Sequence, residues 1–472
     1  MRRWAAWVVV MATLAGATAG RAESDLVLPA VTRTTLENGL RVVVAEQHEL
    51  PLVEFYVIVG AGAAQDPKGK EGLADLTAVA LKRGAGGRSA QAMADAIESL
   101  GGTISAAAGT DGTTITGEFL APDFAAGLDL LREVLREPTF ARDEIRRARD
   151  EQVAAITAGL EEPAGIAERC YAAFVYGTHP YGRPMEGRRA TVRDLGRGDV
   201  HDFYDRWYRP NATILVVVGD VTTEAALAGV RNAFGTWRPS PSALAERTPV
   251  PARRTARRFL LVDIPDATQT QIRFGNLAMR RADPDYTAAQ VANTMLGGGF
   301  SSRLIDELRV KRSLTYSAWS AFSARLTGGD FRVGTFTKTP TTVETLALAL
   351  EVTGTIRAGA PAPAELAKAK AYLRGQFALK LETPDALAGR LAEIEFQGLP
   401  PDELERYRAR VAALTPDDIA RVATLHVPPP DTMQLVVVGR ASEIRAPLEA
   451  RFGAARVVRP DACEDPATLG GP

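Results

Sequence analysis

The chain has 472 residues, 46% of them hydrophobic, and its 56 basic side chains nearly balance 57 acidic ones. This length allows two to four ordinary domains, and the even charge excludes the basic footprint of a nucleic-acid-binding protein or a polybasic membrane patch. Two cysteines, Cys170 and Cys463, exclude a disulfide framework and a cysteine-rich zinc module, and leave open either one bridge or two free thiols.

The N-terminus has the pattern of a cleavable signal peptide. Arg2 and Arg3 precede an apolar run that is too short and too rich in Ala and Gly to span a bilayer, and small residues follow it. We therefore expect residues 1–22 to direct export into the periplasm and to be removed there. No other stretch is long and apolar enough for a membrane span.

The first half, residues 30–237, alternates strand and helix patterns. An Asn-Gly turn at residues 38–39 separates two strand patterns, and an apolar strand pattern follows at residues 53–59. Helices are then predicted over residues 69–84 and 89–101, followed by a hairpin and a long helical region. The half closes with a V-V-V-G strand and a helix that ends in F-G.

The second half, residues 259–457, repeats this plan after a Pro-rich basic linker at residues 238–258. It also closes with V-V-V-G followed by a helix ending in F-G, which indicates an internal duplication. The sequence predicts an α+β fold of two related halves, each an antiparallel sheet with helices packed on it. Residues 458–472, which contain Cys463, are expected to form a disordered tail.

The stretch at residues 69–84 reads GKEGLADLTAVALKRG and predicts one buried helix with a cationic last turn and a glycine stop. It resembles the segment that carries the inverted zinc motif H-x-x-E-H in the insulinase-like (pitrilysin and mitochondrial processing peptidase) zinc peptidases. Further segments resemble that family in the same order, including HPYGRP, WYRPNATILVVVGD and LGGGFSSRLIDELRVKRSLTYSAWS. The resemblance implies that the two halves form one side of a clamshell.

The zinc-binding residues of that motif are replaced here. Asp75 stands in place of the first His, Ala78 in place of the general base Glu, and Val79 in place of the second His. The family's third ligand, a Glu, falls near Ala154 or Ala155, and the neighbouring Glu151 and Glu161 fit solvated helix positions better. Zinc needs about four N, O or S donors, so we expect no metal site and no catalytic residue in this chain.

The resemblance assigns substrate binding to a different pair. In LRVKRSLTYS, Arg309 and Tyr316 match the Arg and Tyr with which the family contacts the substrate peptide. Arg offers a planar set of charge-assisted donors, and a Tyr O–H can donate to a carbonyl oxygen that becomes an oxyanion. From spacing alone, an ordinary helix-end cation and a strand aromatic explain the two residues better.

Other candidate residues have simpler interpretations. The glycines of LGGGFSSRL lack the strand and the Lys-Ser/Thr of a phosphate loop, which favours a turn that faces substrate. Glu71 and Asp75 lie four residues apart but have no partner base, so acid–base catalysis is not expected. His179 is interpreted as a loop residue with a local structural role, and His201 as part of the start of a helix.

Together these features predict a non-catalytic subunit of an exported, heteromeric insulinase-like peptidase. Its partner would be a related subunit that binds Zn²⁺ and cuts peptides, while this chain completes the chamber and binds substrate through Arg309 and Tyr316. No cofactor is expected in this chain itself. The alternative is a peptide-binding or scaffold protein with the peptidase fold and no catalytic partner.

Overall fold

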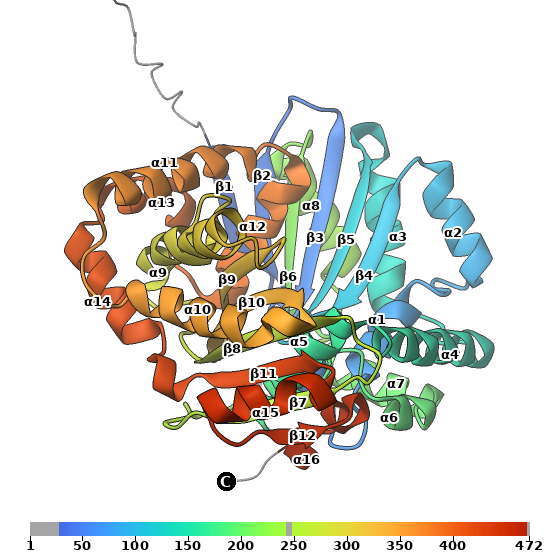
Figure 1. The fold of residues 1–472 in the computed structure, drawn as a ribbon. Coiled ribbons are helices and arrows are strands. Elements are labelled where there is room, and N and C mark those ends of the chain that lie inside the picture. The colour runs from blue at the N-terminus through green and yellow to red at the C-terminus, as the bar shows by residue number, and fades with distance from the viewer. Residues whose placement is uncertain (1–27, 242–247, 470–472) are drawn as a thin grey trace, which may run out of the picture.

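The computed structural model describes residues 28–241 and 248–469, which form two six-stranded sheets with helices packed on them (Figure 1). The predicted signal peptide at residues 1–22 lies outside the described residues. None of the described helices has the length and apolar character needed to cross a membrane.

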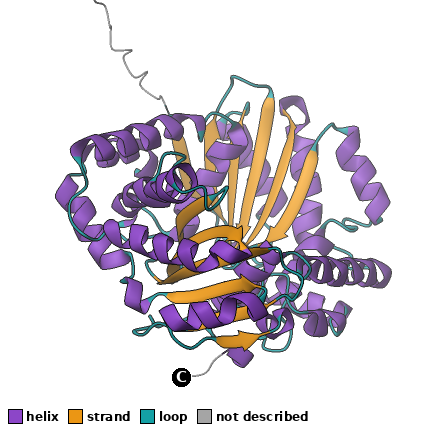
Figure 2. Cartoon of the chain, in the orientation of Figure 1, coloured by secondary structure: helices purple, strands orange, loops and turns teal. Residues whose placement is uncertain are grey.

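The first sheet has the strand order β1-β2-β6-β3-β5-β4. All neighbours in it are antiparallel except β2 and β6, which run parallel. Its strands appear side by side in the upper part of Figure 2. They are β1 (Val31–Thr35), β2 (Arg41–Glu46), β3 (Leu52–Val59), β4 (Thr103–Ala108), β5 (Thr113–Leu120) and β6 (Thr213–Gly219).

Most helices of the first half cover one face of this sheet. Alternate residues of β3, such as Val53 and Phe55, point into the core beneath them, as the period of a strand requires. The helices are α1 (Leu73–Leu81), α2 (Ala90–Ser99), α3 (Phe124–Arg136), α4 (Arg142–Gly159), α6 (Arg189–Arg193), α7 (Arg197–Trp207) and α8 (Thr223–Phe234).

The second sheet has the corresponding order β12-β7-β11-β8-β10-β9, but its edge strand β12 runs parallel to β7, whereas β1 is antiparallel to β2. The two V-V-V-G strands, β6 and β11, hold the same third place, and each is parallel to the strand in second place, β2 or β7. The predicted duplication is therefore present in the topology. The strands are β7 (Phe259–Asp263), β8 (Gln269–Leu277), β9 (Ala318–Ala324), β10 (Gly329–Lys338), β11 (Gln434–Gly439) and β12 (Arg456–Val458).

Helices of the second half form the core over one face of this sheet. They include two π-helical segments, η6 (Thr294–Gly298) and η7 (Ile305–Lys311). The α-helices are α9 (Tyr286–Asn293), α10 (Thr342–Thr355), α11 (Pro363–Leu379), α13 (Glu403–Ala413), α14 (Pro416–His426) and α15 (Ala441–Phe452).

Each half also sends one helix to the sheet of the other half. Helix α5 (Pro163–Tyr176) packs on β8 and β11, and its Glu168 accepts hydrogen bonds from Arg273 of β8 at 2.5 Å and from Arg332 of β10 at 2.6 Å. Helix α12 (Pro384–Gln397) packs on β3 and β6 of the first sheet. The two repeats, residues 30–237 and 259–457, are therefore separate in the sequence, but each contributes one helix to the layer that covers the other's sheet.

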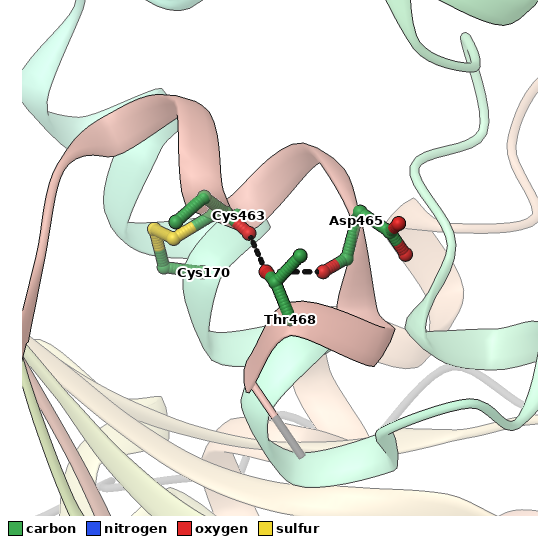
Figure 3. The surroundings of a disulfide bond; sticks show 5 residues. Cys170, Cys463, Asp465 and Thr468 are labelled. Atoms are coloured by element: carbon green, nitrogen blue, oxygen red, sulfur yellow. Dashed lines mark hydrogen bonds between the residues drawn. A yellow bond between two sulfur atoms is a disulfide. The ribbon is translucent and has the colours of Figure 1, made fainter.

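The C-terminal segment is folded rather than disordered, which corrects the expectation for residues 458–472 as far as Leu469. It begins at Val458, the last residue of edge strand β12, and adds a short 3-10 helix η10 (Pro460–Glu464) and α16 (Pro466–Leu469). Cys463 is fully buried and forms a disulfide with Cys170 of α5, with the two Cα atoms 4.8 Å apart (Figure 3). The two cysteines are therefore bonded, and the option of free thiols is wrong.

Ion pairs reinforce this attachment. Arg189 contacts Glu464 at 2.6 Å, and Arg188 contacts both Asp465 at 3.3 Å and Glu71 at 2.9 Å. The composition of this segment, rich in Pro and Gly, suggested disorder. Composition alone cannot show that a segment binds partners far away in the sequence, so the prediction failed here. The segment is held by one covalent bond and by two arginines at the start of α6.

Candidate functional site

Helix α1 is shorter than the predicted 69–84. Gly69 and Gly72 both have positive φ angles, 84° and 99°, so the helix begins only at Leu73. The buried carboxylate of Asp66 caps it, accepting hydrogen bonds from the N–H groups of Gly72 at 2.7 Å and Ala74 at 2.8 Å. Burial raises the pKa of Asp66 to about 7, and the two N–H donors oppose that rise.

The three replaced motif positions all lie on α1. Asp75 and Val79 are partly buried and one turn apart, while Ala78 is completely buried. Burial raises the pKa of Asp75 to about 6, and the nearby charge of Glu186 adds to the effect. Val79 packs against the core of the first half. Of these side chains only Asp75 carries an atom that can bind a metal ion.

Helix α4 supplies no ligand to complete the set. Ala154 and Ala155 are exposed, and Glu151 is an exposed partner of Arg83. The buried residue of α4 that reaches the start of α1 is Gln152, whose amide donates to the carbonyl oxygen of Gly72 at 3.0 Å. Throughout residues 28–241 and 248–469, no group of three His, Cys, Asp or Glu ligand atoms includes Asp75.

Glu71 does not form a carboxylate pair with Asp75. It accepts a hydrogen bond from Arg188 at 2.9 Å and another from the N–H of Gly69 at 3.1 Å. Although burial opposes these bonds, the pKa of Glu71 is lowered. Glu71 therefore fixes the loop before α1 as an ionised group.

Arg309 and Tyr316 lie together, as the resemblance implies. The Arg309 guanidinium carbon is 4.7 Å from the centre of the Tyr316 ring and 5.4 Å from that of Phe300. Both rings are exposed, Tyr316 at 74% and Phe300 at 79%. We call these three residues the Arg309 stack. Cation–π contact holds the guanidinium near the rings while leaving its N–H groups free to bind another molecule.

Phe300 was not predicted from the sequence, although it directly follows the three glycines at residues 297–299. A Cβ on Gly297 would lie 2.4 Å from the backbone nitrogen of Ser320, so only glycine lets this loop approach β9 so closely. That approach brings Phe300 over Arg309. The sequence signal is an aromatic residue at the end of a glycine run, nine residues before a candidate binding cation.

A second acidic cluster lies in the second half. Ligand atoms of Asp283, Asp285 and His426 come within 4.8 Å of one another. Both carboxylate oxygens of Asp285, however, accept hydrogen bonds from Arg421, at 2.7 and 2.9 Å. The Arg421 interaction lowers the pKa of Asp285. We therefore interpret this cluster as an ion-pair network between α9 and α14.

The two histidines singled out from the sequence have structural surroundings. His179 accepts the N–H of Tyr181 at 3.1 Å and faces the carbonyl oxygen of Pro249 at 2.8 Å, and burial lowers its pKa. His201 lies in α7 against the ring of Phe140, with centroids 5.1 Å apart. Neither belongs to a group of ligands in the described part of the chain.

Comparisons with known proteins identify the family. Residues 41–188 match the family described as insulinase (peptidase family M16), and residues 194–373 match the one described as peptidase M16 inactive domain. The chain belongs to the insulinase (M16) family. This confirms the resemblance to the insulinase-like peptidases, while the assignment of Asp75, Ala78 and Val79 to the motif positions stays a prediction.

Similar members of the insulinase family carry contrasting descriptions. An uncharacterized zinc protease of Mycobacterium leprae is 29% identical over 80% of this chain and 85% of its own length. A non-peptidase homolog, YmxG, of Helicobacter pylori is 24% identical over 76% of this chain and 82% of its own. The family thus includes both proteins named as zinc proteases and one named as lacking peptidase activity.

Solved structures confirm the α+β fold of two sheet-and-helix halves. A peptidase M16 inactive domain from Pseudomonas fluorescens superposes with a TM-score of 0.82 at 28% identity, covering 87% of this chain and 98% of that one. A protease from Helicobacter pylori has a TM-score of 0.79 at 22% identity, covering 87% of this chain and all of that one. The second likeness supports the fold alone.

Proposed function

We propose that this M16 chain is the non-catalytic subunit of an exported, heteromeric zinc peptidase, in which it binds the peptide substrate. One contrast carries the proposal. At Asp75, Ala78 and Val79 the helix has kept its fold and its cap but has lost the ligands of the motif, while the exposed Tyr316 remains in contact with the half-buried Arg309. The chain thus keeps side chains that can donate hydrogen bonds to a substrate, although it lacks the side chains that would bind a metal ion.

The Arg309 stack supplies the binding chemistry. The guanidinium can donate two parallel hydrogen bonds to a peptide carbonyl or carboxylate, and the Tyr316 hydroxyl can donate to an oxygen on which negative charge develops. Such donors lower the barrier only when a nucleophile arrives from elsewhere. In this proposal a partner subunit of the same family holds the Zn²⁺ that activates a water molecule for the attack.

The N-terminal pattern supports an exported location. Residues 1–22 have the charge and apolar run of a signal peptide, and an oxidising compartment suits the Cys170–Cys463 disulfide. We therefore place the complex in the periplasm.

A second candidate function is peptide binding or scaffolding without any catalytic partner. The Helicobacter pylori relative named a non-peptidase homolog favours this possibility. The two functions differ in what purifies with the chain from its native host. A co-purifying chain with an intact H-x-x-E-H motif supports the peptidase subunit, whereas its absence supports the scaffold.

The test measures peptide hydrolysis by the chain alone and by the chain mixed with its zinc-bearing partner. Alone, it should show no hydrolysis that a chelator stops. In the complex, Arg309→Ala should lower kcat/KM about 100-fold and Tyr316→Phe about 10-fold, as loss of one transition-state donor does elsewhere.

Nearby residues provide matched controls for this test. Arg312 lies three residues after Arg309, is 54% exposed and pairs loosely with Glu344 at 3.8 Å, so Arg312→Ala should leave kcat/KM within about twofold. Tyr372→Phe plays the same part for Tyr316, since Tyr372 is an exposed tyrosine on α11. If Arg309→Ala and Tyr316→Phe behave like these controls, the proposed role of the stack is wrong.

A further inference from the structure

A cavity of about 190 Å³ opens between the helices α9, α11, α12 and α13, which lie together in Figure 1. Three of these helices pack in the core of the second half, whereas α12 covers the first sheet. Tyr407 of α13 packs against both of the hydrophobic cores that meet here. We call this space the α12 cavity, and its lining shares no residue with the Arg309 stack.

Part of the lining of the α12 cavity is apolar and aromatic. The ring of Phe377 stacks on that of Tyr407, with the ring centroids 4.6 Å apart, and Tyr286 of α9 adds a third ring. Ile394 and Leu404 are buried beside the same space. A cavity of about 150 Å³ with apolar walls can hold one benzene molecule. The α12 cavity therefore has room for one aromatic ring with a short chain attached.

The charged part of the lining has a surplus of positive charge. Glu393 accepts hydrogen bonds from two arginines, Arg281 at 2.7 Å and Arg390 at 2.5 Å. Glu403 pairs at 2.6 Å with Arg410, which lies outside the lining, and is 3.9 Å from Arg281. Two carboxylates are thus shared among three arginines, which leaves a net positive charge at the cavity.

Lys380 adds a further cation to this surplus. It directly follows α11, lines the cavity and is exposed, so the cavity meets the solvent there. In the described part of the chain, the carboxylates of the lining pair with arginines and none pairs with Lys380. An anionic group bound beside Lys380 would gain a charge-assisted hydrogen bond without breaking an ion pair that the protein already has.

We propose that the α12 cavity binds a small aromatic carboxylic acid, with the carboxylate at Lys380 and the ring beside Phe377 and Tyr407. The ionised acid supplies the negative charge that the lining lacks, and its ring occupies the apolar part of the space. A metal cation would meet the surplus of positive charge, and an inorganic anion would leave the aromatic lining unused. This site does not depend on the proposed peptidase function.

Binding should strengthen the attachment of α12. The lining residues Arg390 and Ile394 belong to α12, whereas Tyr286, Phe377 and Tyr407 belong to the other three helices. One ligand therefore contacts all four helices. Because a ligand that binds only the folded chain stabilises it by mass action, the acid should raise the Tm of the protein.

The experiment titrates the full chain calorimetrically with 3-phenylpropionate and with 3-phenyl-1-propanol, which has nearly the same shape without the charge. The native chain should bind the acid about tenfold more tightly than the alcohol. Lys380→Met should weaken binding of the acid about fivefold and leave binding of the alcohol within about twofold. Lys368→Met, at an exposed position of α11 outside the cavity, should behave like the native chain.

A photoreactive analogue, 3-(4-azidophenyl)propionate, locates the bound acid. After irradiation and proteolysis, mass spectrometry should find the label within residues 281–290 or 373–407, and an excess of 3-phenylpropionate should suppress it. The proposal is overturned if the native chain binds neither compound or binds both equally. An unchanged preference in Lys380→Met, or a label elsewhere in the chain, also overturns it. None of these results bears on peptide hydrolysis by the complex, so the proposed function stands or falls separately.

Discussion

Asp75 and Val79 lie one helical turn apart on α1, the spacing at which two histidines share a zinc ion. Because the helix and its Asp66 cap are intact, restoring the two ligands should restore part of the site. Replacing both with histidine (Asp75→His with Val79→His) should give micromolar Zn²⁺ binding, against no measurable binding by the native chain, in a calorimetric titration. Asp75→His alone is the control, and equally weak binding by the double variant would show that α1 has lost the framework too.

Glu54 of β3, which is 3% exposed, makes a second prediction at the scale of one residue. Burial and the nearby carboxylates of Glu118 and Asp385 raise its folded-state pKa to about 8, above the unfolded value near 4.5, so ionisation is harder in the folded protein. The native chain should therefore lose stability as the pH rises from about 5 to 9, on the order of 2–4 kcal/mol. In urea unfolding, Glu54→Gln should match the native chain at pH 5 and exceed it at pH 9. A difference that does not change with pH would contradict this assignment.

The residues of the site were only partly predictable from the sequence. The positions Asp75, Ala78, Val79, Arg309 and Tyr316 could be assigned because short segments around them resemble those of the insulinase-like family. Phe300 joins Arg309 only because Gly297 lets a loop approach β9. A contact of that kind depends on the tertiary fold.

At the scale of elements, the exchange of α5 and α12 joins the two halves. Arg33 of β1 pairs with Glu395 of α12 at 2.9 Å, and Tyr171 of α5 donates to the carbonyl oxygen of Phe331 in β10 at 3.1 Å. The duplicated V-V-V-G strands predicted the repeated topology correctly. The exchange itself was not predictable, because an amphipathic helix shows that one face is buried but not which sheet covers it.

Weakening α12 should therefore weaken the first sheet. Leu391 is 1% exposed in the core between α12 and that sheet, so Leu391→Ala should lower the free energy of unfolding by about 2–5 kcal/mol. Leu379→Ala on α11 is the matched control, because Leu379 is 63% exposed, and it should change stability by less than about 0.5 kcal/mol. Equal effects in urea denaturation would mean that α12 does not stabilise the sheet.

At the scale of the whole molecule, the Cys170–Cys463 disulfide closes a loop across 293 residues. Replacing both cysteines with serine should cost about 2–5 kcal/mol of stability and make residues 459–469 a site of rapid cleavage by thermolysin. The native chain, unfolded without reductant, should show no free thiol. Reductant should sensitise the native chain and leave the serine variant unchanged; thiols detected before reduction would count against the bond.

The crossing helices also constrain how the protein matures. Strands β1 to β6 are synthesised well before α12. Until α12 is made, Val43, Val216 and Val218 stay exposed to water, and the buried face of α5 likewise stays exposed until β8 and β11 are made. The first half cannot complete its architecture until the ribosome has made the second half as far as Gln397, and the second half needs α5 of the first. A gene split at the linker would therefore yield two fragments that aggregate singly and become soluble when produced together.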